Sequence, residues 1–158
     1  MKKIFILFSL MTFSNIIFSQ EYTGIITKVI DGDTVHMSSD NQLIKVRLRY
    51  IDAPEIGQAY GIKSKDFLKN LVLNQTVTVS SSYNDRYGRM IGDIYIYNTR
   101  ENIYVNAKMI KSGNAWVYKT YRNNKYLINL EQIAKDLKNG IWLDDNPLEP
   151  WIHRQIIK

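Results

Sequence analysis

The feature that most constrains the fold is a regular alternation of apolar and basic residues over positions 44–50. The order along the chain is Ile44, Lys45, Val46, Arg47, Leu48, Arg49, Tyr50. A period of two is typical of a β-strand with one buried face and one polar face. We therefore predict a strand over 44–50, with the side chain of Arg47 pointing away from the apolar face.

Acidic residues flank this strand on both sides. Asp33 stands at the start of the preceding predicted strand, and Asp52 comes just past the end of the strand over 44–50. Antiparallel pairing of the two strands through a turn near Asp40 and Asn41 brings both acids to the same end of a hairpin. The sequence therefore indicates a cation site at that end.

Periodicity and turn residues divide the rest of the chain into short strands and helices. Strands are predicted over 22–30, from 34, over 44–50, 76–80 and 91–97, with brief ones over 103–105 and 115–118. Apolar residues at helical spacing predict helices over 62–73, over 107–111 and along a stripe from Leu127 to Leu137. Together these elements predict an α+β fold, a five-stranded Greek-key barrel of the oligonucleotide-binding type with about three helices.

Length and composition indicate one domain with an affinity for polyanions. The chain has 158 residues, 45% of them hydrophobic, a net charge of +6 and no cysteine. One domain with a real core fits this length, and it must be stable without disulfides. The positive charge favours a polyanionic partner. Tyrosines beside basic residues, as in Arg86-Tyr87 and Tyr121-Arg122, suit stacked bases and phosphates on a single strand.

The N-terminus has the pattern of a secretory signal peptide. Lys2 and Lys3 precede an apolar run over 4–10, and a second apolar patch ends at Ser19. We expect a signal over residues 1–19 with cleavage after Ser19, a domain over 20–143 and a poorly ordered tail over 144–158. The mature protein is then secreted or periplasmic, monomeric and without stable membrane association. The alternative is a membrane anchor, but polar residues interrupt the apolar run at Thr12, Ser14 and Asn15.

Four spaced motifs resemble the successive signatures of the staphylococcal-type thermonucleases. They are VIDGDT over 29–34, RL over 47–48 with IDAPE over 51–55, DRYGR over 85–89, and AK over 134–135 with GIW over 140–142. The match keeps the family's order from about Tyr22 to Trp142. It implies an oligonucleotide-binding barrel that acts as a calcium-dependent endonuclease on DNA and RNA. The family likeness further implies a preference for single-stranded regions and products with a 3′-phosphate.

The resemblance implies a calcium site made of hard oxygen ligands. Asp33 and Asp52 match the family's calcium carboxylates, and the backbone carbonyl of Ala53 matches a further ligand. Calcium prefers oxygen ligands of this kind and keeps water in the rest of its shell. The family's reference members have a threonine at the position of Ala53, so a supporting hydroxyl is missing here.

The resemblance also implies catalytic and substrate-binding roles. Glu55 matches the glutamate that activates water, and Arg47 and Arg89 match two arginines that hold the phosphate, expected to support turnover more than binding. The loop over 56–60 is shorter than in the best-studied members, which affects how Glu55 is held. Residues matching positions beside the bound nucleotide are Arg86, Tyr87 and Tyr121.

Two other functions are compatible with parts of the sequence. A non-catalytic nucleic-acid-binding module would keep the barrel, but it has no need of Asp33, Asp52 and Glu55 together. An exported domain that binds anionic polysaccharide or peptide would explain the basic charge and leave the carboxylates without a role. Three further tyrosines are predicted to pack on the barrel and not to stack on bases: Tyr95, Tyr97 and Tyr104.

Overall fold

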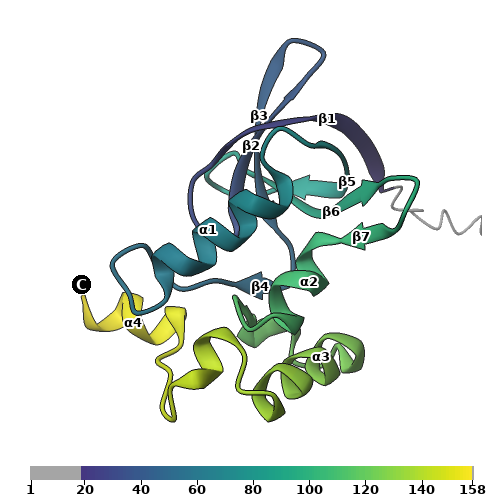
Figure 1. Cartoon of the computed structure of the whole chain (residues 1–158). Coiled ribbons are helices and arrows are strands. Elements are labelled where there is room, and N and C mark those ends of the chain that lie inside the picture. Colours follow the sequence, from purple (N-terminus) through teal and green to yellow (C-terminus); the bar gives the residue numbers. More distant parts are fainter. Residues whose placement is uncertain (1–18, 158) are drawn as a thin grey trace, which may run out of the picture.

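Five strands close into a barrel at one end of the molecule (Figure 1). The computed structural model describes residues 19–157. Its largest sheet has the order β3-β2-β1-β5-β6-β7, and parallel pairing of β3 with β6 closes the barrel. The predicted five-stranded barrel is thus confirmed, with β7 added at one edge. The strands are β1 (Gln20–Val29), β2 (Thr34–Ser39), β3 (Gln42–Leu48), β5 (Thr76–Asn84), β6 (Met90–Tyr97) and β7 (Asn102–Tyr104).

The β2–β3 hairpin forms as the alternation predicts. Its turn residues Asp40 and Asn41 have φ values of 48° and 61°, the left-handed conformation that matches the twist of a two-residue hairpin. The register pairs Thr34 with Arg47, which places Arg47 beside the acid that precedes Thr34. The strand ends at Leu48, earlier than predicted, because Tyr50 has a φ of 70° and turns the chain out of the barrel.

That turn leads into a small second sheet. Strand β4 (Ile51–Asp52) pairs antiparallel with β8 (Trp116–Val117), so that Asp52 lies opposite Trp116. The buried carboxylate of Glu131 accepts a hydrogen bond from the backbone N–H of Val117 at 3.0 Å. Glu131 therefore fixes β8, and β8 in turn pairs with the strand that contains Asp52.

The structure contains four α-helices within the described residues, one more than predicted. They are α1 (Gly61–Val72), α2 (Val105–Lys111), α3 (Lys125–Asp136) and α4 (Pro150–Ile156), and two 3-10 turns lie over Lys119–Tyr121 and Gly140–Leu143. The side chain of Asn124 caps α3 by accepting from the N–H of Leu127. Helix α2 packs against α3 and against β6.

The prediction of a poorly ordered tail is wrong for residues 150–156, which form α4. Pro150 begins the helix, where its fixed φ and missing N–H are tolerated, and it is buried. The ring of Trp151 meets that of Tyr118 at 5.9 Å. The sequence analysis underestimated the apolar contacts available to this segment, because they are made with residues more than thirty positions away.

Two glycines meet where the end of α2 approaches the Gly140–Leu143 turn. Gly113 and Gly140 have φ values of 69° and 56°, and a Cβ on Gly140 would lie 2.1 Å from the carbonyl oxygen of Gly113. The N–H of Ile141 donates to that same carbonyl at 2.8 Å. Both the backbone conformation and the close approach therefore require glycine at position 140.

We expect Gly140→Ala to lower the free energy of unfolding by about 2–3 kcal/mol, from left-handed strain and the steric clash. Urea unfolding followed by tryptophan fluorescence measures the change. Gly57→Ala is the control, because no atom lies within 4 Å of a Cβ at position 57. Equal stability of the two variants would contradict this explanation.

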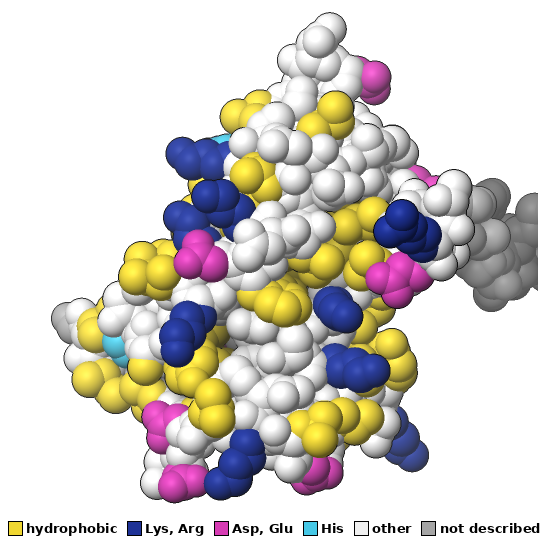
Figure 2. Space-filling model, viewed as in Figure 1, with side chains coloured by type: hydrophobic (Ala, Val, Ile, Leu, Met, Phe, Trp, Pro, Cys, Tyr) yellow, Lys and Arg dark blue, Asp and Glu magenta, His cyan; other side chains and the backbone are white. Residues whose placement is uncertain are grey.

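The charged residues do not form one continuous basic surface on the face shown in Figure 2. Lys and Arg side chains lie there in separate groups, with acidic and apolar side chains between them. Among the helices of residues 19–157, none is long and apolar enough to cross a membrane. The predicted signal peptide lies outside the described residues except for Ser19.

Candidate active site

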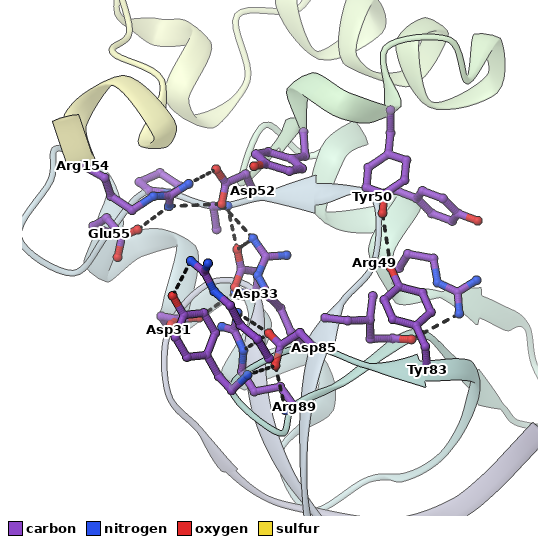
Figure 3. A pocket seen from close by; sticks show the side chains of 18 residues that line it. Asp31, Asp33, Arg49, Tyr50, Asp52, Glu55, Tyr83, Asp85, Arg89 and Arg154 are labelled. Carbon is purple, nitrogen blue, oxygen red and sulfur yellow. Dashed lines mark hydrogen bonds and ion pairs between the residues drawn. The ribbon is translucent and has the colours of Figure 1, made fainter.

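A cavity of about 490 Å³ opens where the β2–β3 hairpin, the 85–89 loop and α4 meet. All nine residues that the sequence singled out line it, although they come from five separate parts of the chain: Asp33, Arg47, Asp52, Ala53, Glu55, Arg86, Tyr87, Arg89 and Tyr121. Figure 3 shows carboxylates and guanidinium groups facing one another across this cavity. The pocket therefore combines the predicted residues into one polar site.

Asp33 and Asp52 share one arginine at the base of the pocket. Arg47 Nη2 lies 3.2 Å from Asp33 Oδ2 and 2.8 Å from Asp52 Oδ1. Asp33 Oδ2 also accepts the N–H of Ala53 at 3.1 Å. Burial raises the pKa of Asp52, and the charge of Asp33 adds to this, while hydrogen bonds from Arg154 oppose it. The end of the hairpin thus concentrates negative charge, as predicted.

The negative charge extends to Asp31. Its Oδ1 accepts the N–H of Asp33 at 3.0 Å. Burial, followed by the charge of Asp33, raises the pKa of Asp31 to about 6. An acid whose pKa is raised in the folded state destabilises the fold once the pH exceeds its ordinary pKa, because the unfolded chain ionises first.

We expect Asp31→Asn to stabilise the protein in chelator at pH 7 by about 1–2 kcal/mol, after allowance for partial solvent screening. The amide oxygen can still accept the N–H of Asp33. The gain should vanish below the ordinary pKa of 3.8 and reach its full value above about 6. Urea unfolding from pH 3.5 to 7 measures it, with the exposed Asp66→Asn as control. A gain that is independent of pH would contradict the electrostatic explanation.

The donor set of the hairpin end fits a hard divalent cation. Asp33, Asp52 and nearby backbone carbonyls offer oxygen alone, and both carboxylates already turn an oxygen toward one cationic group, Arg47 Nη2. Within residues 19–157 no three acidic, histidine or cysteine side chains are grouped closely enough to hold a metal by themselves. Asp33 and Asp52 would therefore hold a cation with help from backbone carbonyls or water, which is usual for calcium.

Glu55 reaches the pocket from the loop between β4 and α1. Its N–H donates to Gln58 Oε1 at 3.2 Å. Its carbonyl packs on Gly61, where a Cβ would lie 1.8 Å from the oxygen. The first residue of α1 must therefore lack a side chain for the short 56–60 loop to hold the Glu55 backbone in this position.

The opposite wall is the tight loop between β5 and β6. Asp85 accepts the N–H groups of Tyr87 and Arg89 at 2.9 Å and pairs with Arg89 Nη2 at 2.7 Å. Burial acts to raise the pKa of Asp85, but these hydrogen bonds outweigh it and lower the pKa. Gly88, with a φ of 75°, closes the turn. Asp85 therefore orients Arg89 toward the pocket.

The tyrosines at the mouth differ in exposure. Tyr87 is 66% exposed, and the guanidinium of Arg86 lies 4.9 Å from its ring centre. Tyr121 packs edge-on against Tyr50, with ring centres 4.8 Å apart. Tyr87 is thus accessible to solvent at the mouth of the pocket, whereas Tyr121 forms part of the wall.

Tyr95, Tyr97 and Tyr104 lie outside the pocket. The ring of Tyr95 stacks on those of Tyr97 and Tyr104, with centres 5.9 and 4.9 Å apart. Tyr104 packs against the core as predicted. Tyr97 is 58% exposed, so its contact with the barrel is made through Tyr95.

Several pocket residues were not predicted from the sequence. Arg154 on α4 pairs with Asp52, Nη2 to Oδ2 at 2.6 Å, and its Nη1 contacts Glu55 Oε1. A proline followed by apolar and basic residues is a helix-start signal that could have revealed α4, but no local pattern reveals its partners. The other unpredicted residues of the lining include Asp31, Arg49, Tyr50, Tyr83, Asp85 and Tyr118.

Comparison with known proteins supports the resemblance seen in the motifs. The family model described as staphylococcal nuclease homologue matches residues 45–144. The chain belongs to this family. It is 41% identical over 131 residues to an uncharacterized endonuclease of Escherichia coli O157:H7, covering 83% of this chain and 84% of that protein. It is 34% identical over 145 residues to a micrococcal nuclease of Shigella flexneri, covering 87% and 83%.

Membership of the staphylococcal nuclease homologue family, together with the carboxylates and arginines that line the pocket, makes the chain a nuclease. Its substrate is accordingly nucleic acid. The matched region begins inside β3 and ends just after the Gly140–Leu143 turn. Helix α4, which carries Arg154, lies beyond it.

Proposed function

We propose that the chain is an exported, calcium-dependent endonuclease that hydrolyses phosphodiester bonds of DNA and RNA. The single observation that carries the proposal is the convergence of Asp33, Asp52 and Glu55 with Arg47 and Arg89 in one pocket. Phosphodiester hydrolysis needs an activated water and positive charge around the pentavalent phosphorus. This set of side chains can supply both.

In the proposed mechanism each side chain has a distinct task. Glu55 accepts a proton from the attacking water, whose oxygen bonds to phosphorus as the bond from phosphorus to the 5′ oxygen breaks and that oxygen takes a proton from solvent. Arg89, oriented by Asp85, donates hydrogen bonds to the phosphate. Arg47 balances the charge of the two buried aspartates. Asp33, Asp52 and the Ala53 carbonyl would hold calcium, which when bound contributes Lewis-acid stabilisation of the phosphate charge.

A preference for single-stranded nucleic acid and products with a 3′-phosphate are part of the proposal. The exposed ring of Tyr87, with Arg86 and Arg89 within 5.6 Å of its centre, supports stacking on an unpaired base. The likeness of the motifs supports the 3′-phosphate. The N-terminal sequence pattern supports export to the periplasm or medium, and a monomer remains the proposed form.

The test is cleavage of end-labelled single-stranded DNA and RNA by the purified protein with calcium, with magnesium and with chelator. Cleavage with calcium that chelator abolishes is the expected result, and digestion of the labelled products with a 3′-phosphatase identifies their ends. Binding without cleavage under every condition would replace the enzyme with a nucleic-acid-binding module.

A further inference from the structure

The C-terminal helix α4 lies beside the loop between β4 and α1 (Figure 1). Gln58 links the two, since its Nε2 donates to the carbonyl of Leu148 while its Oε1 accepts the N–H of Glu55. Trp151 packs on Tyr118, which also lines the pocket. The segment that carries Arg154 is therefore attached to the same loop as Glu55.

Arg154 points from α4 directly at the acidic side of the pocket (Figure 3). Its Nη2 lies 2.6 Å from Asp52 Oδ2, and its Nη1 lies 3.3 Å from Asp52 Oδ1 and also contacts Glu55 Oε1. The side chain is 38% exposed, so part of it is accessible to solvent. Arg154 thus touches both a proposed calcium ligand and the proposed base.

Arg154 and Arg47 differ in the partners of their Nη groups. Arg47 Nη1 donates to the carbonyls of Leu48 and Ile51, and its Nη2 faces both aspartates. The Nη groups of Arg47 are therefore directed at carbonyls and carboxylates of the pocket base, while its Nε has no acceptor in the part of the chain that the structure describes. Among the described residues, neither Arg154 Nε nor the second hydrogen of Nη2 has an acceptor, and the same is true of Arg89 Nη1.

Arg89 on one wall and Arg154 on the other therefore both keep donors for a phosphate, as does Arg86 at the mouth, which donates within residues 19–157 only from Nη2 to the Tyr87 hydroxyl. Arginine suits this task because its planar group can hold two phosphate oxygens or a phosphate and a carboxylate together. Because Asp52 is also a proposed calcium ligand, Arg154 must release an oxygen of the Asp52 carboxylate when the cation binds. The Arg154 guanidinium, still in contact with Glu55, can then also donate from Nε and from the free Nη2 hydrogen to a bound phosphate.

We propose that Arg154 is a phosphate-binding arginine, acting with Arg89 on the phosphodiester that is cleaved. The inference rests on the proposed nuclease function and adds a substrate-binding residue to it. It makes α4, outside the family-matched region, part of the active site.

The test compares Arg154→Ala and Arg154→Lys with the control Arg100→Ala, which removes an exposed arginine outside the pocket. At saturating calcium we expect kcat/KM on single-stranded DNA to fall roughly ten- to a hundredfold for Arg154→Ala, the range for one charge-assisted hydrogen bond. Arg154→Lys should recover part of the loss, and Arg100→Ala should match wild type. Binding of a phosphorothioate oligonucleotide with calcium, measured by fluorescence anisotropy, should weaken for Arg154→Ala.

The outcomes are distinguishable. Wild-type-like or faster cleavage by Arg154→Ala would overturn the proposal and make Arg154 a counter-ion that competes with calcium. An equal loss in Arg154→Ala and Arg154→Lys with unchanged oligonucleotide binding would also overturn it. Thermal unfolding of each variant shows whether the fold is intact. Failure of wild type to cleave would instead reject the nuclease function itself.

Discussion

Glu55→Gln is expected to reduce cleavage of single-stranded DNA by about 10²–10⁴-fold, the usual contribution of a general base. Glutamine keeps the shape of the side chain and an oxygen that can still accept from Arg154, but it cannot take a proton from water. The 56–60 loop should stay in place, because it is held by the backbone of Glu55 through Gln58 and Gly61. Single-turnover kinetics at saturating calcium measure the loss.

Substrate binding is the matched readout for this variant. The affinity of Glu55→Gln for a phosphorothioate oligonucleotide should stay close to wild type, since no donor to phosphate is removed. Glu101→Gln, which changes an exposed glutamate outside the pocket, is the control and should cleave normally. Cleavage by Glu55→Gln within a few-fold of wild type would assign water activation to another group.

Arg47→Ala is expected to lower the free energy of unfolding in chelator by about 3–5 kcal/mol, the range for removing one partner of a buried ion pair. The substitution leaves Asp33 and Asp52 buried without their shared guanidinium. It also leaves the carbonyls of Leu48 and Ile51 without the hydrogen bonds of Nη1. Urea unfolding measures the loss, and added calcium should stabilise this variant more than wild type, because a cation replaces the missing charge.

Arg89→Ala is the comparison for that prediction. Arg89 pairs with Asp85, which stands four residues earlier in the same loop near the surface. Ion pairs of this kind contribute about 0–1 kcal/mol to stability. Arg89→Ala should therefore keep its stability and lose turnover. Similar stabilities for the two variants would show that Arg47 is not the counter-ion of the buried aspartates. The family resemblance implies a phosphate-binding role for both arginines, and the structure adds that Arg47 pairs with two buried aspartates.

The sequence by itself determined the barrel and most of the acidic side of the pocket. The alternation over 44–50 and the left-handed turn at Asp40 and Asn41 are local patterns, and they suffice to bring Asp33 and Arg47 together. The helix predicted over 62–73 differs by one residue at each end from α1. These features depend on local hydrogen bonding and on periodicity, so they can be predicted from the sequence alone.

Only the tertiary structure decided how the pocket is completed. Asp52 is placed by β8, which is held by Glu131 on α3, and no period in the sequence links these residues. Arg154 lies 102 positions from Asp52 and 99 from Glu55. Contacts of this range depend on how α4 packs against the 56–60 loop and Tyr118, because the chain must fold back before these groups can meet. The sequence therefore predicts the chemistry of the hairpin, and the packing of the C-terminal helix adds an arginine to it.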